Sequence, residues 1–359
     1  MKITKVEYEV AYVQQTHVLK IAFAEIDKTP AIFLKLTTDE GIIGYGEACP
    51  FSPVTGENEK TVLAALETFT PGLIGADPFD LQGIHAMMDN CLYGNGSAKC
   101  AVDIACYDII GKKAGQPLYK ILGSGNNKLV TDVTIGINKP EIMARRATEW
   151  VEKGFNILKI KTGINPDDDV EAIRLMRESF GYDVLIRVDG NQGYTVGSAL
   201  EVIPRFAKLG VKAVEQPLPY WDIDGLATVR RNALSYGVQI MADESLHSPH
   251  DALRLCQTGA VDVLNIKLMK CGGIYPALKI DAIGEAYGVN CMVGCMFDTK
   301  LALSAAVALV AAKKNITEAD TDAFLLINDQ GKPMHGGFTN EGSVITCSDA
   351  PGLGIDVDF

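Results

Sequence analysis

The chain has 359 residues, of which 47% are hydrophobic and 22% charged, so it is long enough for a large core and is not globally disordered. Its formal net charge of −12, with no basic tract, excludes a nucleic-acid binder. The longest apolar run, residues 301–312, is too short to span a bilayer, and the first residues lack the apolar core of a signal peptide. We therefore expect no membrane partner and a cytoplasmic location. The nine cysteines lack metal-ligand spacing and are expected to be small buried residues.

The first 125 residues have the pattern of an α+β domain. Alternating apolar and polar residues predict an antiparallel sheet with strands at 2–13, 31–36 and 42–48. Apolar residues three and four positions apart predict helices near 59–73, 81–92 and 98–113. The glycine- and asparagine-rich segment 123–127 then marks a domain boundary.

Residues 126–326 change to a repeated strand and helix pattern. Buried parallel strands are expected at 129–137, 157–161, 184–189, 213–215, 238–243, 261–267 and 290–294, with a short eighth one near 316–326. Seven or eight such units predict a closed barrel that carries the active site. The remaining residues, 327–359, have no helical period and are expected to pack back on the first domain.

Charged residues end these apolar runs at nearly constant intervals. From Lys161 to Asp189, Glu215, Asp243 and Lys267, the steps are 28, 26, 28 and 24 residues. That is about the length of one strand-plus-helix unit. A parallel barrel would bring the five side chains together at the C-terminal ends of its strands, where barrel active sites lie.

The three carboxylates of this set predict a metal site. Asp189, Glu215 and Asp243 are hard oxygen ligands without a nearby His or Cys, which favours one Mg²⁺ per subunit, with Mn²⁺ as the alternative, over zinc. Any one of them alone would more simply be a solvated loop residue or a helix N-cap. Three on consecutive strands point to a shared ion.

The lysines predict proton transfer. Lys159 and Lys161 lie two positions apart on a strand and face the same side, and Lys267 ends a strand nearly opposite. Their proximity to one another and to a metal is expected to lower their pKa values, so that a lysine acts as a base. With one lysine on each face of a carbon α to a carboxylate, a proton leaves from one side and returns from the other, which inverts the centre. A metal would stabilise the enediolate between the two steps.

The sequence resembles the enolase superfamily, in particular the dipeptide epimerases of its muconate-lactonizing-enzyme subgroup. The resemblance rests on the Lys159-Ile160-Lys161 motif, the three carboxylates and the 265–273 segment around Lys267, and it covers nearly the whole chain. It implies a modified (β/α)₇β barrel with a capping domain. It also implies that Lys161 and Lys267 are the acid/base pair, with Lys159 assisting electrostatically near the substrate carboxylate.

The subgroup also contains N-acylamino acid racemases and o-succinylbenzoate synthases, which remain the alternative, together with a non-catalytic barrel. Dipeptide epimerases carry an Asp-x-Asp motif similar to Asp320 and Asp322, which would hold the free ammonium group of a dipeptide. Relatives that epimerise Ala-Glu place an arginine near Ala24, so we expect apolar or basic C-terminal residues in the substrate. Phe297 is also expected to contact the substrate. The next residue, Asp298, is often a glutamate in relatives. The sequence is compatible with a homo-oligomer and does not determine the oligomeric state.

Overall fold

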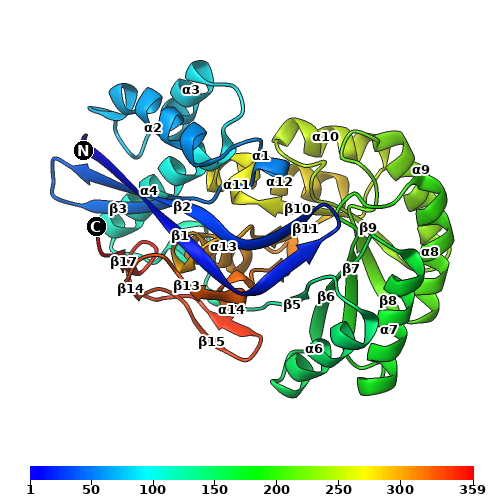
Figure 1. Ribbon diagram of the computed structural model, residues 1–359. Coiled ribbons are helices and arrows are strands. Elements are labelled where there is room, and N and C mark those ends of the chain that lie inside the picture. The colour runs from blue at the N-terminus through cyan, green and yellow to red at the C-terminus, as the bar shows by residue number, and fades with distance from the viewer.

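The computed structural model describes residues 1–359 and places a parallel barrel beside an antiparallel sheet that is covered by helices (Figure 1). The barrel strands are β5 (Val133–Ile135), β6 (Ile157–Lys161), β7 (Leu185–Asp189), β8 (Val211–Glu215), β9 (Gln239–Ala242), β10 (Val263–Lys267), β11 (Asn290–Gly294) and β12 (Ile316–Asp320). They form one sheet in this order, and every neighbouring pair is parallel. The backbone N–H of Asp132 donates to the Ala319 carbonyl at 3.4 Å, which links the two ends of the sheet.

Helices connect all consecutive barrel strands. They are α6 (Pro140–Glu152), α7 (Pro166–Phe180), α8 (Val196–Lys208), α9 (Ile223–Leu234), α10 (Pro249–Thr258), α11 (Leu268–Cys271) with α12 (Ile274–Tyr287), and α13 (Lys300–Ala312). Two of them begin at capping residues that are followed by a proline. The Asn165 and Ser248 side chains accept hydrogen bonds from backbone N–H groups in the first turn of α7 and α10. Seven helical connections and eight strands confirm the predicted (β/α)₇β barrel.

The capping domain is an antiparallel sheet with helices packed on it. Its strands are β1 (Ile3–Ile21), β2 (Ala24–Thr38), β3 (Ile43–Ala48) and β13 (Ile327–Asp329), and its helices are α1 (Ser52–Thr55), α2 (Glu59–Leu73), α3 (Leu81–Cys91), α4 (Gly96–Ala114) and α5 (Leu118–Ile121). Glycines on β3 allow α4 to lie directly on the sheet, because a Cβ at Gly46 would lie 1.9 Å from the Ala101 carbonyl oxygen. This contact fixes the segment after β3, which continues to the barrel mouth.

The β1–β2 hairpin is much longer than the sequence predicted and reaches the barrel (Figure 1). A two-residue turn, Ala22–Phe23, joins the strands. Near this turn the Ile137 N–H donates to the Lys20 carbonyl at 2.8 Å, which ties the hairpin to the loop after β5. The capping domain therefore contributes side chains to the mouth of the barrel.

The tail returns to both parts of the molecule. β13 pairs with β1, β14 (Met334–Gly336) pairs with β17 (Ile355–Val357), and β15 (Thr339–Glu341) pairs with β16 (Val344–Thr346). β16 also pairs with β4 (Lys128–Val130), so the single strand predicted at 129–137 is wrong. The chain turns at Thr131 and Asp132 because both side chains bond inside the barrel, and β5 starts only at Val133.

The division into residues 1–125, 126–326 and 327–359 stays a prediction. Among the helices of the structure, not one combines the length and the apolar character that crossing a bilayer requires.

Candidate active site

The five charged residues singled out by their spacing meet at one end of the barrel. Lys161, Asp189 and Glu215 end adjacent strands and stand side by side in the β-ladder. Asp243 directly follows β9, and Lys267 ends β10, four strands away from β6 in the sheet order. All five are buried, and the two lysines line a small cavity from opposite sides of the barrel.

The three carboxylates form one cluster. Asp189, Glu215 and Asp243 each offer an oxygen within 4.8 Å of the other two, and their exposed fractions are 0%, 2% and 1%. Burial and then the Asp189 charge raise the pKa of Glu215 to about 7, a shift that a bound cation would oppose. Three convergent hard oxygen donors fit a divalent cation such as Mg²⁺.

The lysines are bonded to these carboxylates. Lys161 Nζ lies 2.6 Å from Asp189 Oδ2, and Lys267 Nζ lies 2.8 Å from Asp243 Oδ2. Burial alone would raise the pKa of Asp189, but Lys161 and Lys159 lower it to about 2. Burial likewise opposes charge on Lys267, yet Asp243 raises its pKa. Among these protein groups alone, the carboxylate contact outweighs burial and the neighbouring cations at Lys267. The expected lowering concerned a lysine beside a metal ion and stays a prediction.

Lys159 lies two residues before Lys161 on β6, deeper in the barrel interior than the ends of the strands. Its Nζ lies 2.8 Å from Asp320, 2.9 Å from Glu215 and 3.0 Å from Asp189. Burial alone would lower its pKa, but Asp320 and Glu215 raise it well above the usual value. Lys159 thus stays an ammonium group beside the carboxylates. The electrostatic role toward the substrate that the resemblance implies for it stays a prediction.

Two residues that contact the cluster were not predicted from the sequence. Lys270 Nζ lies 2.5 Å from Asp243 Oδ1, and Asn265 Nδ2 donates to Glu215 Oε1 at 2.7 Å. Both sit in the quoted 265–273 segment. Asn265 precedes Lys267 by two positions on β10 and so faces the same interior, which was the signal that could have found it.

Strained backbone follows the carboxylates. Asn191, Gln192 and Gln216 have φ values of +38°, +67° and +31°, a region that residues other than glycine rarely adopt. Asn191 N–H donates back to Asp189 Oδ1 at 2.9 Å, and Gln216 Oε1 accepts the Asp243 N–H at 2.9 Å. Such strain concentrates at functional sites. Here these contacts fix the positions of two cluster carboxylates.

The Asp320–Asp322 pair lies on the opposite wall of the same cavity. Asp320 Oδ2 accepts from Lys159 at 2.8 Å, and Asp322 Oδ2 accepts the Thr134 N–H at 2.6 Å. Burial and then Asp320 raise the pKa of Asp322 to about 6. β12 ends at Asp320, and Asp322 is the residue before the short helix α14 (Ala323–Leu326). The two carboxylates nevertheless meet at the cavity, as the sequence predicted.

The remaining wall is apolar and comes largely from the capping domain. Phe51, which follows β3, stacks on Phe23 of the hairpin turn with 6.3 Å between ring centroids and meets Phe297 edge to face at 5.7 Å. Leu19 and Ile21 of β1 continue this wall. Phe297 also lines the cavity, and its predicted contact with the substrate stays a prediction.

Ala24 does not reach this cavity. It begins β2, where it pairs with Ile21 and packs at the edge of the core. The preceding residue, Phe23, takes the place at the cavity wall, because the turn between the strands has only two residues and turns Phe23 toward Phe51. Phe23, and not Ala24, is therefore the residue of this turn that lines the cavity, and the alignment of Ala24 with the arginine of relatives stays a prediction.

Two family models match this chain. Residues 5–123 match the mandelate racemase / muconate lactonizing enzyme N-terminal domain, and residues 142–359 match the enolase C-terminal domain-like model. A hydrophobic dipeptide epimerase of Enterococcus faecalis is 41% identical over 99% of each chain. An L-Ala-D/L-Glu epimerase of Clostridium acetobutylicum is 42% identical over 94% of each chain. An N-succinyl-L-Arg/Lys racemase of Bacillus cereus is 38% identical over 100% of this chain and 96% of its own.

Solved structures give the same relationship. The dipeptide epimerase of Enterococcus faecalis, complexed with Mg and the dipeptide L-Leu-L-Tyr, matches with a TM-score of 0.96 and 40% identity over 99% of this chain and all of that one. A substrate-liganded L-Ala-D/L-Glu epimerase of Bacillus subtilis matches with a TM-score of 0.96 and 38% identity over the full length of both chains. The chain belongs to the mandelate racemase / muconate lactonizing enzyme family of the enolase superfamily.

Proposed function

We propose that this isomerase is a Mg²⁺-dependent dipeptide epimerase that inverts the α-carbon of the C-terminal residue. One observation carries the proposal: two lysines, Lys161 and Lys267, line one small cavity from opposite sides, between the carboxylate cluster and the Asp320–Asp322 pair. A dipeptide has a carboxylate at one end, which would bind the cation of the cluster, and an ammonium group at the other, which would bind the Asp320–Asp322 pair.

The residues divide the work as follows. Asp189, Glu215 and Asp243 would hold Mg²⁺, which supplies positive charge to the substrate carboxylate and to the enediolate formed from it. One of Lys161 and Lys267, as the free amine, takes the α-proton. The other, as the ammonium, returns a proton to the opposite face, so the proton count is unchanged and the centre is inverted. Lys159 adds fixed positive charge beneath the cluster.

The apolar wall favours an apolar C-terminal residue. The only cations that line the cavity are the lysines of the catalytic wall, Lys159, Lys161 and Lys267. Lys20 and Lys28 of the hairpin do not line the cavity. Lys20 is paired with Glu25 at 3.2 Å, and Lys28 lies over the Tyr12 ring at 4.5 Å.

Basic C-terminal residues, which the sequence left open, have less support. The acidic residues of the hairpin, Glu25 and Asp27, do not line the cavity, and Asp27 accepts instead from Gln14 at 3.0 Å. Phe23, Phe51 and Phe297 would contact the substrate side chain.

N-acylamino acid racemisation is the alternative, supported by the Bacillus cereus relative. An N-acyl or N-succinyl group has no ammonium for Asp320 and Asp322, and a succinyl carboxylate would meet two buried carboxylates without a compensating cation on that wall beyond Lys159. The pair therefore favours a dipeptide over an N-acyl substrate.

Deuterium exchange tests the proposal directly. In D₂O with Mg²⁺, the enzyme should exchange and invert the α-proton of the C-terminal residue in L-Ala-L-Leu, followed by proton NMR and chiral chromatography. N-succinyl-leucine is the matched probe of the alternative, and o-succinylbenzoate formation is a second. Faster exchange of N-succinyl-leucine than of every dipeptide would reject the epimerase in favour of a racemase. The cytoplasmic location and a homo-oligomer stay predictions.

A further inference from the structure

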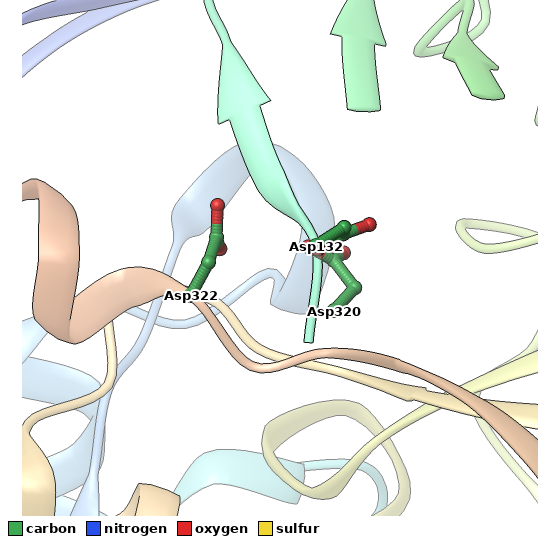
Figure 2. A group of neighbouring side chains, drawn as sticks. All are labelled: Asp132, Asp320 and Asp322. Carbon is green, nitrogen blue, oxygen red and sulfur yellow. The ribbon is translucent and has the colours of Figure 1, made fainter. Parts of the chain in front are cut away.

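A third carboxylate lies beside the Asp320–Asp322 pair. Asp132, just before β5, offers an oxygen within 4.8 Å of oxygens of both Asp320 and Asp322. Figure 2 shows Asp132, just before β5, directly beside Asp320, while Asp322 lies further along the segment that leads from β12 to α14. All three are nearly inaccessible to solvent, at 0%, 3% and 3% exposure.

Each of these carboxylates keeps one oxygen without an N–H partner. Asp320 uses Oδ2 for Lys159, and Asp322 uses Oδ2 for the Thr134 N–H, while its Oδ1 meets only the Cys295 thiol at 3.9 Å. Asp132 uses Oδ2 for Arg187, and its Oδ1 is buried without any partner. Buried polar atoms without partners are rare in folded proteins and need an explanation.

The geometry suits one compact donor. Three atoms that lie within 4.8 Å of one another share a point roughly 2.8 Å or less from each, the usual N–H···O distance. An ammonium group has three donors. Burial and then Asp320 raise the pKa of Asp132, and Arg187 opposes this rise. A further cation beside the three carboxylates would favour their charged forms.

We propose that Asp132 is the third carboxylate of the site that binds the substrate's ammonium group. Asp320 and Asp322 line the cavity at this site, and Asp132 completes it from the barrel interior. This inference rests on the proposed function and deepens it. Asp132 does not line the cavity itself, so it acts from the barrel interior through its charge. Its Oδ1 is the one oxygen of the three residues that is buried without any partner.

Arg187 positions this carboxylate. Its guanidinium bonds Asp132 through Nη2 and Glu318 through Nη1, and Nη1 also contacts Met292 Sδ at 2.9 Å. Arg187 is 3% exposed and lies two residues before the cluster ligand Asp189 on β7. A second divalent ion in place of the ammonium is disfavoured, because Lys159 and Arg187 already stand against two of the three carboxylates.

The matched substrates for the test are L-Ala-L-Leu and N-propanoyl-L-leucine, which differ only in the α-amine. Asp132→Asn keeps the side-chain shape and removes the charge. With Mg²⁺ present, we expect it to raise the KM and the calorimetric Kd of L-Ala-L-Leu by about tenfold or more while kcat changes less than about threefold. The Kd of N-propanoyl-L-leucine should change less than about threefold, as should the Kd for Mn²⁺.

Glu318→Gln is the matched control, since Glu318 shares Arg187 but lies outside the three-carboxylate cluster. It should leave the dipeptide KM within about threefold. If Asp132→Asn does not fold, the double variant Asp132→Asn/Arg187→Gln removes the unpaired cation and should show the same KM change. Equal losses for both ligands, equal losses in the control, or an unchanged dipeptide KM would overturn the inference while leaving the epimerase in place. A wild type that neither binds nor exchanges any dipeptide would reject the proposed function, and this inference with it.

Discussion

Replacement of Glu47 by alanine should destabilise the protein and loosen the apolar wall of the cavity. Glu47 lies on β3 of the capping domain, is 0% exposed, and accepts from Thr299 N at 2.9 Å, Thr299 Oγ1 at 2.6 Å and Ala302 N at 3.0 Å. It thereby caps the barrel helix α13 from another part of the chain. The variant leaves three buried donors unpaired, each worth about 1–3 kcal/mol, and entering water offsets part of this. With three such donors and this offset, we expect a total loss of about 3–5 kcal/mol.

The same change should alter substrate preference, because Phe297 precedes Thr299 by two residues. Urea unfolding followed by far-UV circular dichroism measures the first effect, and the ratio of KM for Ala-Phe to KM for Ala-Ala measures the second. The ratio should rise at least threefold.

Asp103→Ala is the control for this test. Asp103 also caps a barrel helix from the capping domain, accepting from Ile274 N at 2.5 Å and Tyr275 N at 3.2 Å, and none of these residues lines the cavity. It should cost similar stability and leave the KM ratio unchanged. A loss below about 1 kcal/mol for Glu47→Ala, or the same ratio change in both variants, would refute the reasoning.

Four further outcomes are expected. Asp189→Asn should weaken Mn²⁺ binding at least a hundredfold by calorimetry, and excess EDTA should stop turnover until Mg²⁺ is restored; full activity in EDTA would contradict the metal site. Lys267→Ala should abolish epimerisation, a loss of several kcal/mol in transition-state stabilisation, while exchange of one stereoisomer persists in D₂O; epimerisation at the wild-type rate would exclude two bases. Burial raises the pKa of Asp169 to about 6, so the folded state binds the proton more tightly than the unfolded state. The free energy of unfolding should therefore fall as the pH rises from about 4 to 6, by about 2–3 kcal/mol relative to Asp169→Asn, as measured by urea titrations. The same dependence of this free energy on pH in the wild type and in Asp169→Asn would refute this. The wild type should turn over Ala-Leu and Ala-Phe with higher kcat/KM than Ala-Glu, and Phe23→Arg should reduce this difference in kcat/KM. A higher wild-type kcat/KM for Ala-Glu would mean that another cation binds the glutamate side chain of the substrate.

The sequence predicted the barrel and its charged end well, because both depend on patterns that repeat along the chain. Buried parallel strands read as apolar runs, and a site residue at the end of each run marks the C-terminal face of the barrel. Lys161, Asp189 and Lys267 therefore fell in the correct places from spacing alone. The roles assigned to them stay predictions.

The apolar wall was harder to foresee, because it depends on contacts between distant segments. Phe23 and Phe51 belong to different parts of the capping domain and reach the cavity through the length of a hairpin and the packing of β3 on α4. Neither length nor packing has a local signature. The sequence pointed to Ala24, whereas its neighbour Phe23 lines the wall, since neighbouring residues in a tight turn point in different directions.

The charged layer inside the barrel, by contrast, had a signal in the sequence. Successive side chains on a strand alternate between its two faces, so a residue two positions before a site residue shares its face. This relation joins Lys159 to Lys161, Arg187 to Asp189, Asn265 to Lys267 and Glu318 to Asp320, and all four earlier residues contact another polar side chain of the barrel interior. Barrel interiors are usually filled by branched apolar residues, and the apolar cluster here is only Ala213, Met241, Val263 and Met292. Burying charges in place of such a core brings little stability. The layer is better explained by the site above it, where Lys159 and Arg187 hold the carboxylates in place.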